Sequence, residues 1–473
     1  MPSHLPSRIP NPRVILAVVL LAVFSFALLQ SLISPVLPAL QEELGTTPTL
    51  ITWVMTAFLL SASVCTPVVG RLGDRYGKDR LLVVSLAALA VGSVLSALAP
   101  GIELMLAGRV VQGVGGGVLP LAFGVIRDEI PKEKAPNAVG IAAALAAVGG
   151  GVGIVLAGPL TDAFGLRALF WIPAALTVAA AVAAHAVVPP SPSRNPSPIS
   201  WLATGLLAGW LVALLVPLSQ ATRWGWASPA VMTPLAAAVL LAIAWFTVEN
   251  RSDRPLIDMR MMRLPAVWTT NLVSLLFGIA LFAVMTFLPV FVQTPPEAGY
   301  GFGASVTQAG LMLLPMTVTM FFAGLASAPL ARHFGARQVL VAASALNAAA
   351  IALLAFGHDS RWLVPVALTL LGGSLGIGFS TMTNVIVAAV RPEQTGVANG
   401  VTANVRTIGG SLGVALMTAI IGAHTPAAGP PAETGYTYGF AVLGIAGLAA
   451  LAVATLLPGP GGAGPTARSR QYR

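Results

Sequence analysis

The stretch GRLGDRYGKDR, residues 70–80, lies between two long apolar runs, Leu50–Val69 and Leu81–Ala99. It carries four Lys/Arg and two Asp in a chain of which only 9% of the residues are charged. Each flanking run has about 20 residues, enough for a helix to cross the ~30 Å hydrocarbon core of a membrane. The pattern predicts a hairpin of two membrane helices. Its basic loop is typical of the cytoplasmic side, because short Lys/Arg-rich loops stay inside.

The composition of the whole chain is that of a polytopic membrane protein. Of 473 residues, 56% are hydrophobic, far more than a soluble domain of this length requires. The formal net charge is +9, but the cationic residues lie in short loops between apolar runs. Positive-inside topology explains this charge, so we expect no nucleic-acid partner. The single cysteine, Cys65, excludes an intramolecular disulfide framework and a cysteine-rich metal site.

Fourteen apolar runs of membrane length follow one another along the chain. With both termini in the cytoplasm, 20 of the 25 Lys/Arg fall inside; Arg167, Arg223 and Arg361 fall outside, and Arg109 and Arg406 fall within spans. We therefore expect an all-α fold of 14 transmembrane helices with both termini cytoplasmic. The expected spans are residues 14–34, 50–69, 81–99, 103–125, 138–158, 167–188, 201–219, 230–249, 266–291, 306–330, 337–356, 362–390, 395–422 and 437–457.

Breaks in composition divide these spans into six, two and six. The Pro/Ser-rich segment Pro189–Ser200 favours an extended linker, and the polar stretch Asn250–Arg263 follows the eighth span. We predict a six-helix bundle in residues 1–188, a linker and two-helix insert in 189–263, and a second six-helix bundle with a short cytoplasmic tail in 264–473. An internal repeat supports this division. A shift of 260 residues brings Gly140, Gly149, Gly150 and Gly153 onto Gly400, Gly409, Gly410 and Gly413.

Two motifs and the number of spans together resemble a known family. Residues 70–80 match the pattern between spans two and three of the major facilitator superfamily, and Leu106–Gly116 is similar to its span-four motif. With 14 spans and the segment Pro255–Arg260 after span eight, the chain most resembles the 14-span drug:proton antiporter (multidrug efflux) group. The resemblance implies a carrier that exports small molecules by alternating access.

The resemblance also gives the charged loop a role. It implies that Gly70, Asp74, Arg75, Gly77 and Arg80 belong to a latch that joins the two bundles at the cytoplasmic side when the carrier faces outward. Asp74 is then the acidic member of the latch. The glycines permit a tight turn and a close approach of helices. The alternative is that these charges only anchor the loop at an anionic membrane surface.

Polar residues inside the spans are candidates for a coupling or substrate cavity. Arg109 lies several residues into span four, where a charge costs at least ~2.5–3.5 kcal/mol, so it is a functional candidate by default. The resemblance ties it to proton coupling or substrate binding; the alternative is that it snorkels to an interface. Gln112 shares its helix face. The further candidates are Gln30, Asn271, Asn384, Asn404 and Arg406, for which purely structural roles such as helix–helix hydrogen bonds stay open.

Span five carries small residues at intervals of about one helical turn. Such spacing lets a neighbouring helix pack closely. The segment resembles an antiporter motif, but Ile154 stands where that motif has proline, and Pro159 lies five residues further on. A plain packing face and a functional hinge formed by Gly149, Gly153, Gly158 and Pro159 are both open.

The membrane acid that is usual in the antiporter group is missing, since Leu29 stands in its place in span one. None of the 16 Asp/Glu lies near the middle of a span. Proton coupling then has to use a helix-end acid, with Asp128, Glu129 and Asp162 as candidates, or a water-linked network at Arg109, or it is absent. Without an acid in the cavity, we expect neutral or anionic amphiphiles to be preferred over lipophilic dications.

These observations predict a secondary active transporter of the plasma (inner) membrane that exports small amphiphilic molecules and is coupled to protons. The sequence contains no nucleotide-binding loop and no acid/base, nucleophile or metal constellation, so we expect neither an enzyme nor a cofactor. The expected partners are a small-molecule substrate, protons and membrane lipids, and the expected state is a monomer. Two alternatives stay open: an importer or uncoupled facilitator, and a membrane receptor or scaffold that does not transport.

Overall fold

The computed structural model describes residues 11–458 except 132, 192–199, 226, 253–258, 391–394 and 427–430. A few side chains inside helices, that of Asp74 among them, also lie outside the description. All regular secondary structure of the described residues is helical. The first group of helices is α1 (Pro12–Leu32), η1 (Ser34–Val36), α2 (Leu37–Glu43), α3 (Pro48–Tyr76), α4 (Lys78–Ala97), α5 (Ile102–Gly113), η2 (Val114–Gly117), α6 (Val118–Glu129), α7 (Ala135–Phe164) and α8 (Ala168–Val187).

A pair of helices and a second large group follow. The pair is α9 (Trp201–Trp224) and α10 (Pro229–Arg251), with the short α11 (Met259–Met262) after it. The second group is α12 (Pro265–Gln293), η3 (Pro296–Ala298), α13 (Val306–Phe334), α14 (Ala336–Gly357), α15 (Leu363–Ala389), α16 (Thr395–Ala423) and α17 (Glu433–Ala454). Much of the predicted linker, residues 192–199, lies outside the described residues.

Thirteen helical segments of the described chain are long and apolar enough to cross a membrane. The 30-residue α7 is a further long helix, so the helices agree with the fourteen spans expected from the sequence. The outermost example is α10, which exposes the large apolar side chains Val239, Leu240, Ile243 and Phe246. An exposed apolar row of this kind suits contact with lipid and not with water.

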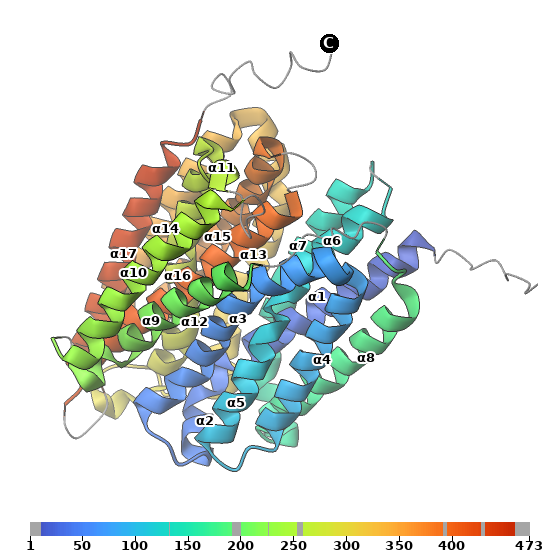
Figure 1. Ribbon diagram of the computed structural model, residues 1–473. Coiled ribbons are helices and arrows are strands. Elements are labelled where there is room, and N and C mark those ends of the chain that lie inside the picture. Colours follow the sequence, from blue (N-terminus) through green and yellow to red (C-terminus); the bar gives the residue numbers. More distant parts are fainter. Residues whose placement is uncertain are drawn as a thin grey trace, which may run out of the picture.

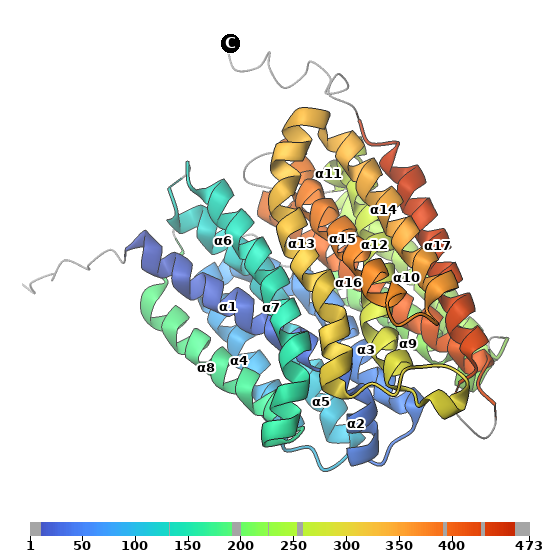
Figure 2. The same ribbon diagram turned by 180° about the vertical axis from the view of Figure 1, so that it is seen from behind.

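The two large groups repeat the same helix pairings. In the first, α1 packs on α7 and α8, α3 on α5, and α4 on α8; in the second, α12 packs on α16 and α17, α13 on α15, and α14 on α17. Figures 1 and 2 show these groups as two bundles, which we call the N bundle (α1–α8) and the C bundle (α12–α17). The internal repeat seen in the glycines is therefore also a repeat of packing.

The bundles meet along two seams. One seam pairs α7 with α13, and the other pairs α3 with α16 (Figure 2). Helix α9 packs on α10 and also contacts both α3 and α16, so the helix pair covers the second seam from outside (Figure 1).

Helix ends follow from local sequence chemistry. Thr47, Ser200 and Ser305 cap the starts of α3, α9 and α13 by accepting hydrogen bonds from backbone N–H groups. At Ser305 the Gln308 side chain completes a capping box.

The predicted charged loop is mostly helical. Helix α3 continues through Arg71 and Arg75 to Tyr76, and a single residue, Gly77 at φ 109°, connects it to α4. Gly335 at φ 86° makes the equivalent connection between α13 and α14. Only glycine adopts these angles without strain, which is why one residue is enough to reverse the chain. The expected loop 70–80 was therefore too long, because polarity is not a helix stop signal.

Two expected spans are interrupted. The fourth is divided by the 3₁₀ turn η2, which consists largely of glycines. A Cβ on Gly116 would lie 2.5 Å from the Thr66 hydroxyl of α3, and a Cβ on Gly113 would lie 2.8 Å from the Ala62 backbone nitrogen. The glycines allow the turn to press against α3. The first span likewise breaks at the Ser34-Pro35 pair of η1.

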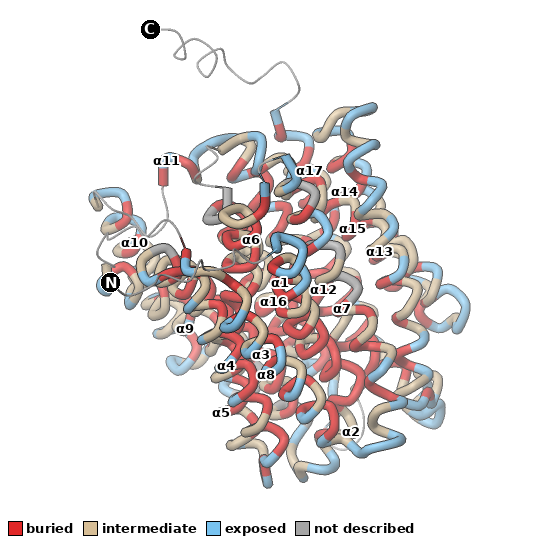
Figure 3. Tube along the Cα trace, turned by 90° about the vertical axis from the view of Figure 1, so that its right-hand side faces the viewer, coloured by how far each residue is buried: buried red, intermediate tan, exposed pale blue. Residues whose placement is uncertain are grey.

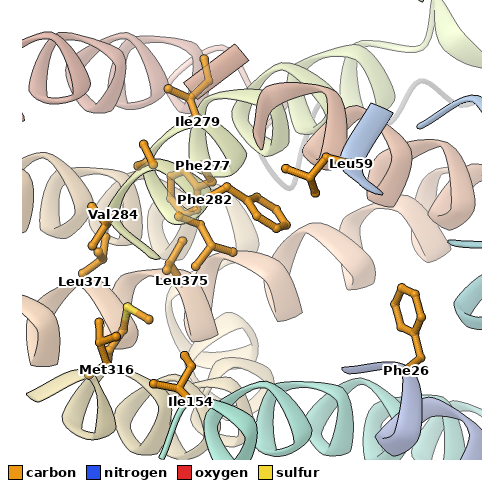
Figure 4. Close-up of a cluster of buried hydrophobic side chains, with 14 of the residues drawn as sticks. Phe26, Leu59, Ile154, Phe277, Ile279, Phe282, Val284, Met316, Leu371 and Leu375 are labelled. Atoms are coloured by element: carbon orange, nitrogen blue, oxygen red, sulfur yellow. The ribbon is translucent and has the colours of Figure 1, made fainter. Parts of the chain in front are cut away.

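Buried residues lie along the inner faces of both bundles (Figure 3). The largest apolar cluster contains side chains of both: Phe26 and Leu59 come from the N bundle, and Phe277, Phe282 and Leu375 come from the C bundle (Figure 4). Apolar side chains therefore line the region between the bundles, and a polar side chain there has few polar neighbours.

Candidate functional site

Arg109 is held entirely inside the N bundle. Its side chain is fully buried at 0% exposure. Nε donates to the Val54 carbonyl at 2.8 Å, one terminal nitrogen donates to Gln112 Oε1 at 2.7 Å, and the other lies 3.9 Å from Met55 Sδ. The guanidinium also lies over the Phe58 ring, 4.7 Å from its centroid. These contacts tie α5 to α3 and rule out the snorkelling alternative.

Gln112 extends the same network to a third helix. Its Nε2 donates to Ser93 Oγ of α4 at 2.9 Å, and the residue is fully buried. Since the described side chains occupy the polar groups of Arg109 and Gln112, neither is open to a substrate in this conformation. Their predicted role in coupling or binding stays a prediction.

Arg406, in α16, is the second arginine within a span, and it lies in the C bundle. Its guanidinium lies over the Phe379 ring of α15, 4.5 Å from the centroid, as Arg109 lies over Phe58. Among the described residues, however, it makes no hydrogen bond or ion pair, and it is only half-buried. Each of the three guanidinium nitrogens of Arg109 therefore has a protein partner, whereas those of Arg406 have none among the described residues.

The predicted amide residues have different environments. Asn271 of α12 accepts a hydrogen bond from Thr402 Oγ1 of α16 at 2.7 Å, which is the helix–helix bond that the sequence left open. Asn404 is buried and its Oδ1 has no partner among the described atoms. Gln30 is half-buried and Asn384 is exposed. No described hydrogen bond joins any two of these four residues, and a shared cavity stays a prediction.

The glycines of α7 serve two neighbours. A Cβ on Gly149 would lie 3.0 Å from the Phe24 carbonyl of α1, and a Cβ on Gly153 would lie 2.9 Å from the Leu28 carbonyl. Gly158 instead faces α13, where a Cβ would lie 2.5 Å from Thr307 Cα. Pro159 is exposed, and the helix continues past it to Phe164. Close packing is therefore present, and a hinge at these residues stays a prediction.

Polar contacts join the two bundles near one end of the molecule. Ser34 of η1 donates to the Met285 carbonyl of α12, and Gln293 of α12 donates to the Pro35 carbonyl at 2.9 Å. The contacts are at the end where α1 and α12 both finish. Sequence reasoning missed Ser34 and Gln293, because a serine or glutamine at a span end carries no distinctive signal.

Asp162 and Thr307 add a side-chain contact at the same end. Thr307 at the start of α13 donates to Asp162 Oδ2 at the end of α7, at 3.0 Å. Asp162 is exposed. Of the three helix-end acids considered from the sequence, Asp162 is thus in contact with the opposite bundle.

At the other end of the molecule, the charged motif makes its contacts within the N bundle. Lys78, which is 5% exposed, forms an ion pair with Asp128 at the end of α6. The Lys78 backbone donates to Ser191 Oγ at 2.9 Å, and Asp79 Oδ1 accepts from the Ser191 backbone at 3.1 Å. Arg75 lies over its neighbour Tyr76.

The remaining motif residues contribute less to these contacts. Arg80 is exposed, and a Cβ on Gly70 would meet nothing within 4 Å. The predicted latch depends on Asp74, whose side chain lies outside the described residues. The latch stays a prediction.

One group among the described residues could offer three ligand atoms to a metal ion: His358, Asp359 and Glu433. His358 Nε2 lies 3.1 Å from Glu433 Oε1 and 3.3 Å from Asp359 Oδ1, while Nδ1 lies 2.9 Å from the Leu354 carbonyl. The same distances suit an ion pair between a protonated histidine and two carboxylates, which joins α14 to α17.

A family model described as Major Facilitator Superfamily matches residues 19–199, 191–414 and 294–471. The chain belongs to the major facilitator superfamily. The family and the fold expected from the sequence are thereby confirmed. The chain's many helices of membrane length agree with a multi-pass membrane protein of this superfamily.

Relatives within the superfamily include named export proteins. The chain is 32% identical to the cephamycin export protein of Amycolatopsis lactamdurans over 90% of its own length and 88% of that protein. It is 29% identical to the tetracenomycin C resistance and export protein of Streptomyces glaucescens, over 86% of the chain and 75% of that protein. The chain spans 57% of the length of two uncharacterized transporters of Mycobacterium tuberculosis, at 29% identity over 83% of its own length.

Solved structures agree on the architecture. The human organic anion transporter MFSD10 aligns over 94% of this chain and 100% of that chain, with a TM-score of 0.69 and 18% identity. At this level of identity the match concerns the fold alone.

Proposed function

We propose that this major facilitator protein exports small amphiphilic molecules, antibiotics or related metabolites among them, across the plasma membrane by alternating access. The observation that carries the proposal is the pair of bundles with equivalent internal packing, which meet along the two seams α7–α13 and α3–α16. Two similarly packed bodies can rock about a site between them without unfolding either one. The named export proteins among the relatives support the direction of transport.

The conformation fits the inward-facing state of such a cycle. The α7–α13 contacts lie along residues 151–162 of α7 and 307–317 of α13, where Gly151 faces Thr317 and Gly310 faces Ile154. Together with the Ser34 and Gln293 contacts, they join the bundles at one end. If both termini are cytoplasmic, as the Lys/Arg distribution favours, this joined end is the outer one. The outer gate is then closed.

The charged motif is consistent with this state. In the inward-facing form the latch at the cytoplasmic end is released, and the described motif charges bind partners of their own bundle, as Lys78 does with Asp128. In the outward-facing form, we expect Asp74 to pair across the bundles.

Proton coupling belongs to the proposal, with Asp162 as the acid best placed for it. Its contact with Thr307 joins the bundles at the end that we take as the outer gate, so protonation and gate opening would be linked through this carboxylate. Asp128 is less suitable because Lys78 already holds it. We further propose a monomeric protein with lipids as its only other partners.

The test of export is a compound-susceptibility screen of a deletion strain and an overexpressing strain. Overexpression should raise, and deletion should lower, tolerance to at least one amphiphilic antibiotic. An unchanged profile in both strains, together with wild-type behaviour of Arg109→Ala and Asp74→Asn, would favour the receptor or scaffold alternative.

The test of coupling is counterflow in proteoliposomes with an imposed pH gradient. Accumulation should follow the gradient, and Asp162→Asn should weaken this dependence while uptake at equal pH continues. If accumulation by the wild-type protein does not depend on the pH gradient, proton coupling is excluded and the protein is an uncoupled facilitator.

A further inference from the structure

The guanidinium of Arg406 lies in the middle of a membrane helix and has no counter-ion among the residues that the structure describes. It lies 11 residues after Thr395, the first residue of α16, which places it about 16 Å along the helix axis. No described residue forms an ion pair or hydrogen bond with it, and its one aromatic partner is Phe379. At this depth lipid headgroups are out of reach.

The comparison with Arg109 shows how the same fold holds an arginine that has protein partners. Arg109 has Val54, Gln112 and Met55 as partners and no exposure. Arg406 shares only the aromatic contact and is half-buried. An arginine that served packing alone would be expected to have the satisfied donors of Arg109, because unpaired buried donors are costly.

No acid with a described side chain forms an ion pair with Arg406. Every Asp and Glu that lies in a described membrane helix is in the first or last turn of that helix. The described ion pairs connect other cations, such as Lys78 with Asp128 and Arg167 with Glu43. Since no described acid supplies the negative charge, a ligand is a candidate source of it.

Aromatic side chains lie beside the cation. Phe379, half-buried, has its ring centroid 6.1 Å from that of Phe277, in an edge-to-face arrangement. Phe282 belongs to the same apolar cluster, which extends to Phe26 and Leu59 of the N bundle (Figure 4). A ligand that placed an acidic group on Arg406 could therefore keep a flat or apolar body against aromatic walls.

We propose that Arg406 is the recognition point for organic anions, in which a carboxylate or sulfonate pairs with the guanidinium while an aromatic or apolar body packs on the Phe379 side. The inference rests on the proposed export function and names the substrate class of the same cavity. The planar fork of arginine suits a carboxylate, which can accept two parallel hydrogen bonds.

The test uses three probes of one shape on the purified full-length protein in detergent: naphthaleneacetate, the neutral naphthaleneacetamide and the cationic naphthylmethylammonium. Binding is measured by titration calorimetry on wild type, Arg406→Gln, Arg406→Lys and the control Arg361→Gln. Arg361 is a matched control, since it also lies over a phenylalanine, Phe302, but is exposed in a loop. Gel filtration and thermal stability verify that each variant is folded.

We expect the wild-type protein to bind naphthaleneacetate more tightly than the amide and the cation least. Arg406→Gln should weaken acetate binding roughly ten- to a hundredfold and leave amide binding nearly unchanged. Arg406→Lys should lose less affinity for naphthaleneacetate, because lysine keeps the positive charge but lacks the planar guanidinium. Arg361→Gln should bind all three probes as the wild-type protein does.

Several results would overturn the proposal. They are equal binding of acetate and amide by the wild-type protein, preference for the cation, failure to bind any of the three probes, or an anion preference that survives in Arg406→Gln. The first three need no variant, so a folding defect of Arg406→Gln would not protect the proposal. Export remains a separate question: a strain that exports neutral antibiotics while the purified protein ignores carboxylates would retain the proposed function and lose the anion site.

Discussion

Replacing Gly413 by alanine should loosen the contact between α16 and α12. A Cβ on Gly413 would lie 2.8 Å from the Cα of Ile279, and it would also press on the carbonyl oxygen of the same residue. Carbon atoms in ordinary contact are about 3.5–4.0 Å apart, so the two helices would have to separate by about 1 Å. The obstacle is backbone, and no rotamer change can relieve it.

The expected loss of stability follows from two opposing terms. Overpacking costs about 1–3 kcal/mol, and the upper value applies where backbone meets backbone. Alanine regains about 1 kcal/mol over glycine through its better helix propensity. The free energy of unfolding should therefore fall by about 2 kcal/mol in Gly413→Ala.

Gly150 is the matched control, since a Cβ there meets nothing within 4 Å. Gly150→Ala should be as stable as wild type or more stable by about 1 kcal/mol. The measurement is the apparent melting temperature of the detergent-purified protein, followed by the fraction that remains monodisperse on size exclusion after heating. A Gly413→Ala protein that melts at or above the wild-type temperature would refute the reasoning, and so would an equal loss in Gly150→Ala.

Three further variants probe the polar contacts, each by the same melting assay. Lys78→Met should lower stability by about 3 kcal/mol because the mostly buried Asp128 loses its close cation and keeps only the 3.6 Å contact with Arg127. Adding Asp128→Leu should restore most of the loss; a double variant as unstable as the single one would contradict the pairing. Arg109→Lys should melt well below wild type although it keeps the charge, since lysine lacks the planar fork; wild-type stability would show that charge alone matters. His358→Ala should cost about 1–2 kcal/mol, and less in a Glu433→Gln background; an equal cost in both backgrounds would exclude the His358–Glu433 contact as the cause.

The overall fold was largely predictable because membrane helices are recognisable as long runs of apolar residues. Hydropathy marked the spans, the Lys/Arg distribution suggested their orientation, and the repeat of Gly149 and Gly153 at Gly409 and Gly413 anticipated the repeated packing. Helix interruptions were harder to foresee. The turn η2 within the fourth span and the continuation of α3 to Tyr76 depend on glycine contacts and backbone angles that hydropathy does not register.

The sequence predicted which residues are candidates for the site, but not which partners these residues have. The sequence selected both Arg109 and Arg406 as charges within spans, and it gave more weight to Arg109. The structure separates them by their partners, since each guanidinium nitrogen of Arg109 contacts Val54, Gln112 or Met55, whereas Arg406 has no described hydrogen bond or ion pair. The inter-bundle contacts of Ser34 could not be predicted, because they join segments about 250 residues apart through backbone carbonyls.

By itself, the sequence determined that the chain is a many-helix membrane protein with a repeated half and a charged motif at one helix junction. These properties depend on residues close together in the chain, where apolar length, glycine and charge act locally. Only the tertiary structure decided which buried polar groups are satisfied and which are not. Helical periodicity assigns a side chain to a face, but the helix that covers that face, and the partners it presents at that depth, come from distant parts of the chain. Arg406 is a candidate binding site because the described tertiary structure gives this charged residue no polar partner.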